Sequence, residues 1–251
     1  MLRPRIIPVL LLKDSGLVKT IKFKEPKYLG DPINTVKLFN DKNVDEIVIL
    51  DITATIEGRK PLFNLIREIV SEAFMPVCYG GGINTLADIE AILSMGVEKV
   101  ALNAAAADNP TFVSEASRLI GSQSVVVSMD VKKSFFGGYE VVTRGGKKKS
   151  RKDPVNYAKE METRGAGEIF VNFVDRDGTM SGYDIEYVKK LTSSLATPVI
   201  ACGGAGKVSD LLQVIKEGGV SAAAAGSIFV FQGPYRAVLI TFPSEEQLAD
   251  L

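Results

Sequence analysis

The chain has 251 residues, of which 46% are apolar and 24% charged, and its 30 basic residues are balanced by 30 acidic ones. This balance argues against a nucleic-acid-binding protein, because neutralising phosphates requires an excess of basic residues. No uninterrupted apolar run reaches the length of a membrane span, and the two cysteines, Cys78 and Cys202, are too few for a disulfide scaffold. We therefore expect a cytoplasmic protein that engages neither nucleic acid nor a membrane.

The sequence contains no histidine. A Ser-His-Asp triad, a Cys-His pair and a His-ligated metal site are therefore excluded. We expect neither a metal nor a cofactor, so any proton transfer depends on carboxylates, lysine, tyrosine or a bound ligand.

Short apolar runs alternate with longer amphipathic stretches along the whole chain. The runs are rich in Val, Ile and Ala on both faces and predict strands over Arg5–Leu12, Glu46–Asp51, Pro76–Tyr79, Glu98–Asn103, Ser124–Asp130, Gly167–Val174, Thr197–Cys202 and Val220–Gly226. Helical patterns lie between them, the first opened by Asp31 and Pro32 and the others near Lys60–Ala73, Thr85–Met95, Asn109–Ile120, Asp153–Arg164, Asp184–Leu195, Lys207–Glu217 and Pro234–Ile240.

Eight strand–helix units in about 250 residues predict an α/β fold, a closed (β/α)8 TIM barrel formed by a single domain over residues 1–251. The main alternative is a doubly wound open sheet, which would leave two edges to protect. An internal repeat favours the barrel, because Met75–Gly82 resembles Thr197–Gly204 at a displacement of 122 residues. Each copy holds four units, so we expect two half-barrels that close on one another.

Two segments interrupt the alternation. Asp14–Gly30 is long and lysine-rich and follows the first strand, where a barrel places an active-site loop; a solvated basic loop is the alternative. Ser134–Lys152 contains Gly137-Gly138 and Gly145-Gly146 and predicts a β-hairpin inserted after the fifth strand. We interpret its basic run, Lys147–Lys152, as a solvated turn rather than a binding patch.

Two glycine-rich loops, Gly80–Gly82 and Gly203–Gly206, each follow a strand and precede a helix. Glycine lets backbone N–H groups approach and surround a phosphate, with the positive end of a helix dipole behind it. The end of the next strand joins each loop, with Asn103 in the first half and Gly226-Ser227 in the second. Two symmetric anion sites predict a long ligand with a phosphate at each end.

Carboxylates end several predicted strands, at the face where a barrel carries its active site: Asp51, Asp130, Asp175 and Asp177. Asp130 ends the apolar run Val125–Met129, so desolvation is expected to raise its pKa toward a range useful for proton transfer. The alternative for Asp130 is a helix cap or an ion pair with a neighbouring lysine. For Asp51 and Asp177, structural and ligand-binding roles stand equal.

Four charged residues of alternating sign lie at or near the starts of strands, at the opposite end of the barrel: Arg5, Glu46, Lys99 and Glu168. This placement predicts a ring of charges that closes the bottom opening. The spacing alone is compatible with a gate and with a purely structural salt-bridge plug.

Several motifs occur together: Arg5–Ile7, Leu50–Ala54 with Glu57–Arg59, Gly80–Ile83, Asp175–Thr179 with Ser181–Asp184, and Gly203–Gly206. With them the sequence resembles the cyclase subunit of imidazole glycerol phosphate synthase, the HisF family, over essentially its whole length. The Asp-Arg-Asp-Gly-Thr element at 175–179 is highly specific in this company.

The resemblance implies a barrel that forms a heterodimer with a HisH-like glutaminase docked at its bottom. Ammonia from the glutaminase would pass through the barrel to a bis-phosphorylated ribonucleotide at the top. The family's charged gate matches the four residues at the strand starts. Its phosphate- and ligand-binding positions match Lys19, Gly82, Asn103, Asp177, Gly178, Gly204 and Ser227, and the loops and strand ends add Asp51, Gly81 and Gly226 as candidates.

The sequence departs from the family at the chemistry itself. Of the two catalytic aspartates, Asp130 is present and the other is replaced by Leu11. Losing a positioned general acid–base typically costs roughly 10²- to 10⁴-fold in rate. Asp14 lies beyond the strand end and cannot simply substitute. Smaller departures occur at Cys202, Asn172 and Ala104.

The retained gate beside Leu11 favours a divergent branch of the family. Its members accompany a glutaminase and a sugar amidotransferase in bacterial surface-polysaccharide (lipopolysaccharide) biosynthesis, where an acetamido group becomes an acetamidino group. The first alternative is a working cyclase of histidine biosynthesis. A stand-alone phosphosugar isomerase, supported only by the fold and the paired phosphate sites, is the second.

Overall fold

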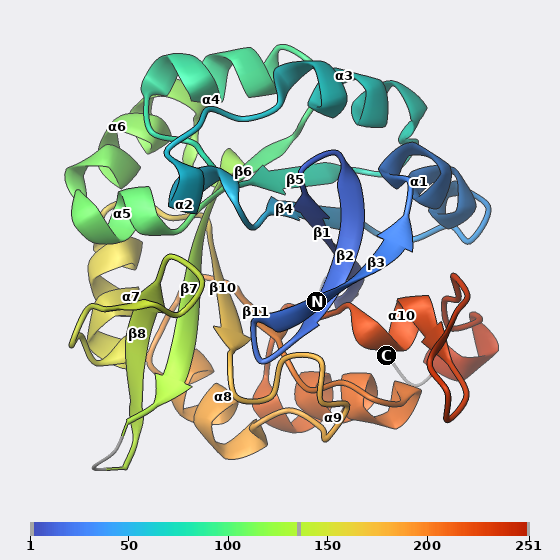
Figure 1. Ribbon diagram of the computed structural model, residues 1–251. Coiled ribbons are helices and arrows are strands. Elements are labelled where there is room, and N and C mark those ends of the chain that lie inside the picture. Colours follow the sequence, from blue (N-terminus) through green and yellow to red (C-terminus); the bar gives the residue numbers. More distant parts are fainter. Residues whose placement is uncertain (1–2, 135–136, 250–251) are drawn as a thin grey trace.

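The computed structural model describes residues 3–134 and 137–249 (Figure 1). Eight parallel strands pair in sequence order, and the last pairs with the first. These barrel strands are β1 (Arg5–Lys13), β4 (Ile47–Asp51), β5 (Val77–Gly80), β6 (Lys99–Leu102), β7 (Val125–Lys133), β10 (Glu168–Phe173), β11 (Val199–Cys202) and β12 (Ala222–Ala225). The predicted (β/α)8 barrel is confirmed, and the open-sheet alternative is wrong because β12 pairs with β1.

Helices form an outer ring around the strands (Figure 1). They are α1 (Pro32–Asn40), α2 (Ala54–Glu57), α3 (Phe63–Glu72), α4 (Leu86–Leu93), α5 (Ala104–Asp108), α6 (Thr111–Ile120), α7 (Pro154–Thr163), α8 (Ile185–Thr192), α9 (Val208–Gly218) and α10 (Ser227–Val230), with 3₁₀ turns at Ser122–Ser124 and Glu246–Leu248. Asp31 caps α1 as predicted, since its Oδ1 accepts the Asn34 N–H at 2.8 Å. Within the described ranges, no helix combines the length and apolar character needed to cross a bilayer.

The predicted last helix, Pro234–Ile240, is wrong. The chain instead forms β13 (Phe231–Gln232) and β14 (Ala237–Val238), which pair antiparallel around a turn. Gly233 and Arg236 both adopt left-handed backbone conformations in this turn, with φ of 71° and 50°. A helix cannot pass through such residues, and the apolar residues that suggested one belong to the two short strands and the segment after them.

Each half-barrel begins with a strand that runs on into antiparallel partners. β1 pairs with β2 (Gly16–Ile21), and β2 pairs with β3 (Lys24–Gly30), so Asp14–Gly30 is a hairpin rather than an irregular loop. β7 pairs with β8 (Tyr139–Thr143), and β8 pairs with β9 (Lys148–Lys149). That the latter segment is an insertion stays a prediction, and its Phe135 and Phe136 lie outside the described residues.

The two hairpins place Leu11 and Asp130 at equivalent points of the two halves. Leu11 on β1 lies opposite Val18 on β2, and Asp130 on β7 lies opposite Val142 on β8. The pair of residues at this level of the barrel therefore consists of one apolar and one carboxylic side chain.

The barrel interior is a separate apolar cluster from the layer between strands and helices. Side chains alternate inward and outward along each strand, so β1 contributes Ile7, Val9 and Leu11 to the interior. The other strands add Val48, Cys78, Ala101, Val126, Phe170, Ile200, Cys202, Ala222 and Ala224. The interior between the two ends of the barrel is therefore lined mainly by small or apolar side chains.

Candidate functional site

A cavity of about 360 Å³ opens at the carboxyl end of the barrel strands. Six of the predicted ligand or catalytic residues line it: Lys19, Asp51, Gly81, Asn103, Asp130 and Asp177. Five predicted residues are not part of its lining: Gly82, Gly178, Gly204, Gly226 and Ser227. The structure thus brings the predicted polar groups together at one mouth, with the phosphate-loop candidates around it.

Asp130 lies at the polar side of this cavity. The Asn103 side-chain amide donates a hydrogen bond to its Oδ2 at 3.0 Å. Burial raises the pKa of Asp130 to about 7, and the nearby negative charge of Asp177 adds to the rise while the Asn103 hydrogen bond opposes it. The expected effect of desolvation on this carboxyl group is confirmed. A group that titrates near neutral pH can both accept and donate a proton.

Asp177 is fixed by the first hairpin. Its carboxylate accepts hydrogen bonds from the Lys19 ammonium at 3.0 Å and the Thr20 hydroxyl at 3.3 Å, and Lys19 and Asp177 are both buried. Gly178 packs so closely on this hairpin that a Cβ there would lie 2.2 Å from the Thr20 carbonyl oxygen. Glycine at 178 is therefore required by close packing, whatever its role toward a ligand.

Asp51 forms a bidentate pair with Arg59, with N–O distances of 2.7 and 2.9 Å. Its Oδ1 also accepts the backbone N–H of Ala54 at 3.0 Å. The hydrogen bond and charge of Asp51 raise the pKa of Arg59 above its ordinary value. Asp51 thus organises the α2 turn beside the cavity, and its direct contact with a ligand stays a prediction.

In the second half-barrel, the glycine loop contacts Gly182, whereas Gly226 lies beside Lys19. The Gly204 carbonyl accepts the Gly182 N–H at 2.8 Å, and a Cβ at Gly226 would lie 3.1 Å from the Lys19 Nζ. The Ser227 hydroxyl is buried without a hydrogen-bond partner among the described residues. The Lys19 ammonium is already paired with Asp177, so binding of a phosphate beside Gly226 and Ser227 stays a prediction.

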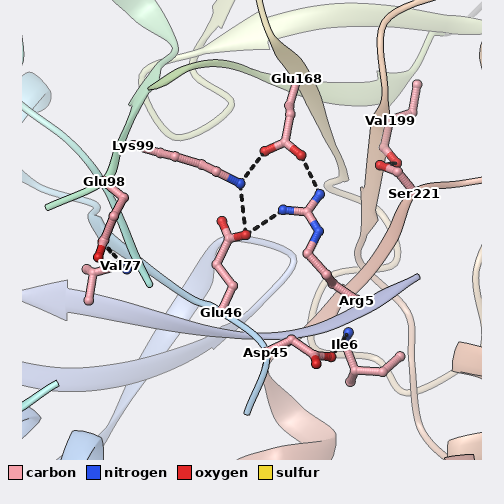
Figure 2. Close-up of polar contacts among 10 residues, drawn as sticks. All are labelled: Arg5, Ile6, Asp45, Glu46, Val77, Glu98, Lys99, Glu168, Val199 and Ser221. Atoms are coloured by element: carbon pink, nitrogen blue, oxygen red, sulfur yellow. Dashed lines mark hydrogen bonds and ion pairs between the residues drawn. The ribbon is translucent and has the colours of Figure 1, made fainter. Parts of the chain in front are cut away.

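The four charged residues at the strand starts form a closed ring (Figure 2). Arg5 donates to Glu46 at 2.5 Å and to Glu168, while Lys99 donates to Glu46 at 2.9 Å and to Glu168 at 2.8 Å. Burial lowers the pKa of Lys99, but the two carboxylates outweigh burial and raise it above its ordinary value. The predicted ring geometry is therefore present at the amino end of the barrel, opposite the cavity.

Leu11 is buried and lines the cavity. Within the described residues, Asp51 is the carboxylate of the first half-barrel in the cavity lining, and it is paired with Arg59, while Asp14 lies outside the lining. The mouth therefore has a polar side at Asp130 and an apolar side at Leu11.

Sequence reasoning missed the contribution of the second hairpin. Arg144, which precedes the basic run Lys147–Lys152, and Lys147 within it line the cavity, whereas the sequence predicts a solvated turn for this run. Arg144 and Lys148 also hold Asp108, at 2.6 and 2.7 Å. The glycine pair Gly145-Gly146 between basic residues was the available signal, since it forms the turn that brings these side chains to the mouth.

Comparisons with known proteins agree with this architecture. A model of the family described as histidine biosynthesis protein matches residues 5–235. The chain is 50% identical over 248 residues to the "Putative imidazole glycerol phosphate synthase subunit hisF2" of Pseudomonas aeruginosa, with 99% of each chain covered. The "Putative imidazole glycerol phosphate synthase subunit hisF3" of Vibrio vulnificus is 48% identical over 248 residues, which cover 98% of this chain and 95% of the relative. The imidazole glycerol phosphate synthase subunit HisF of Alkaliphilus metalliredigens is 42% identical over 229 residues, 91% of each chain.

The chain folds as a (β/α)8 barrel with polar groups gathered at its mouth, and the family model matches it over most of its length. The chain therefore belongs to the histidine biosynthesis protein family. Within that family the chain is a member of the HisF group of imidazole glycerol phosphate synthase subunits, to which it is 42–50% identical.

Proposed function

We propose that this chain is the synthase subunit of a glutamine amidotransferase complex and receives ammonia from a HisH-like glutaminase. The charged ring marks the side where the glutaminase docks, and the apolar interior conducts ammonia to the cavity. An apolar passage suits ammonia, which is uncharged, and disfavours ammonium, since a lone ion pays a large desolvation cost. The names of the relatives, which describe subunits of a synthase, support a partnered protein.

We propose further that the ammonia is used for sugar amidation in surface-polysaccharide biosynthesis, with a separate sugar amidotransferase. The single observation that carries this choice is the apolar Leu11 at the position equivalent to Asp130. Of the two equivalent positions that the resemblance assigns to ring closure of the ribonucleotide, only position 130 carries a carboxylate. Conduction of ammonia requires neither carboxylate.

The alternative is a functional cyclase of histidine biosynthesis. The observation that favours it is Asp130 itself, whose pKa of about 7 and hydrogen bond from Asn103 suit a general acid–base. In this case another group, or a water held in the cavity, would replace the missing aspartate.

Purified protein supplied with the histidine-pathway ribonucleotide and ammonium distinguishes these functions. We expect turnover at least about 100-fold below that of the Alkaliphilus relative, because one positioned acid–base is absent. If turnover were within a few-fold of that of the Alkaliphilus relative, the chain would be a working cyclase, and the proposal of sugar amidation would be rejected. Complementation of a histidine auxotroph, with Leu11→Asp beside the wild-type chain, asks the same question in cells.

The docking side offers a second prediction. Phe74 lies in the segment leading into β5, at the ring end of the barrel, and is 87% exposed. Exposed aromatic side chains are frequent anchors of interfaces. Phe74→Ala is expected to weaken binding of the glutaminase by about tenfold or more, measured by titration calorimetry and by stimulation of glutamine hydrolysis. Tyr235→Ala, at an equally exposed site near the opposite end, is the control; equal losses in both variants would contradict docking at the ring.

A further inference from the structure

A second recess of about 470 Å³ is lined by residues of the first hairpin and its flanks. Its lining includes Lys13, Asp14, Ser15, Gly16, Tyr28 and Asp31. Lys13 and Pro26 line both this recess and the mouth cavity, so the two spaces adjoin. A ligand seated in the recess would therefore lie beside the exit of the barrel.

The recess contains an exposed aromatic platform. Tyr28 lies on β3 opposite Val18 of β2, and its side chain is 66% exposed. A Cβ at Gly16 would lie 2.6 Å from the Tyr28 Cε2 atom, so the ring lies directly against the backbone of residue 16. One ring face is thus supported by the hairpin, and much of the ring stays accessible to solvent.

The polar groups around this platform suit hydroxyls. Asp31 uses its Oδ1 to cap α1, and within the described ranges its Oδ2 makes no hydrogen bond. Asp14 occupies a left-handed turn, with φ of 55°, and neither Asp14 nor Lys13 forms an ion pair within the same ranges. Carboxylates accept hydrogen bonds from neutral hydroxyl donors, and the Lys13 ammonium in the same recess can donate to a hydroxyl oxygen.

We propose that this recess binds the hexose ring of a sugar, which stacks on Tyr28 and donates its hydroxyls to Asp14 and Asp31. Aromatic rings offer a flat apolar surface to the C–H face of a ligand, and flanking acceptors fix its orientation. This inference rests on the proposed function and deepens it, because it positions the acceptor sugar beside the ammonia exit.

The test measures binding of UDP-N-acetylglucosamine to the purified full-length chain, by titration calorimetry and saturation-transfer NMR. Tyr28→Ala is expected to weaken binding about tenfold, and Tyr28→Phe to leave it within about twofold, because the stacking surface is kept. Gly16→Ala provides an independent variant: it keeps the tyrosine but forces its ring off the backbone, so we expect a similar loss. Tyr235→Ala, 94% exposed and outside the recess, is the matched control with no expected effect.

Loss of binding in Tyr28→Ala and Gly16→Ala, with NMR saturation centred on the hexose protons, supports the proposal. Equal binding of UDP alone with the same loss in Tyr28→Ala would show that the base stacks there and would overturn a hexose site. Undiminished binding in both variants would also overturn it. Ammonia transfer from the glutaminase is measured separately, so failure of the sugar site is distinguishable from failure of the proposed function.

Discussion

Replacing Asp130 by asparagine is expected to stabilise the folded chain above neutral pH, although it removes the predicted catalytic group. Burial raises the pKa of Asp130 to about 7 in the folded state, whereas an aspartate in an unfolded chain titrates near its ordinary value of 3.8. The folded chain therefore binds this proton more tightly than the unfolded chain. Stability contributed by the protonated group is complete below about pH 4 and is lost as the pH rises through 7.

The expected magnitude is on the order of 2–4 kcal/mol at pH 8, since each unit of pKa difference corresponds to about 1.4 kcal/mol. Asparagine has nearly the same shape, carries no charge and keeps an acceptor for Asn103. Urea unfolding of wild type and Asp130→Asn at pH 4 and pH 8 measures the effect: the two chains should converge at pH 4 and separate at pH 8. The exposed Asp41→Asn is the control, and a destabilised Asp130→Asn at pH 8 would contradict a buried acid at this position.

Replacing Arg5 by alanine is expected to cause the largest loss of stability at the ring. Arg5 donates to both Glu46 and Glu168, whose side chains are only 3% and 11% exposed. Without it, two nearly buried carboxylates share the single ammonium of Lys99. Breaking a buried ion network by removing one partner costs about 3–5 kcal/mol, because the remaining charge is left uncompensated.

Urea unfolding at neutral pH measures this loss, and Lys37→Ala is the matched control. Lys37 and Glu72 form an ion pair at 3.3 Å, but these side chains are 50% and 40% exposed, so the expected loss is below about 1 kcal/mol. Equal effects at both sites would show that the ring contributes no more than a surface pair. In the complex of Arg5→Ala with the glutaminase, the fraction of the ammonia released from glutamine that reaches the cavity should also fall.

The barrel strands were predictable because every one of them is buried on both faces. A strand covered on both faces reads as a continuous apolar run, and every predicted strand end agrees with the structure within three residues. The ring followed from the same reasoning, since charged residues at strand starts can only gather at one end. Asp130 was recognised as desolvated because it ends such a run.

Features set by contacts between distant loops were not predictable in this way. The hairpin β2–β3 lacks a clean alternation, because Lys19 and Thr20 are buried by contacts with Asp177 rather than by apolar packing. The pairing of Asp51 with Arg59 depends on how the α2 turn folds back. The prediction of a last helix was wrong because Gly233 and Arg236 form a left-handed turn, which no helix can contain, within an apolar sequence pattern.

The closure of the barrel from two repeats has a consequence for folding. The chain crosses between the halves once, between β6 and β7, and the second seam joins β12 to β1. Either half alone would present the unpaired backbone groups of both its outer strands to solvent, which invites aggregation. Fragments severed near residues 121–124 would therefore each expose two unpaired strand edges, and pairing of the two fragments would restore the backbone hydrogen bonds at both seams.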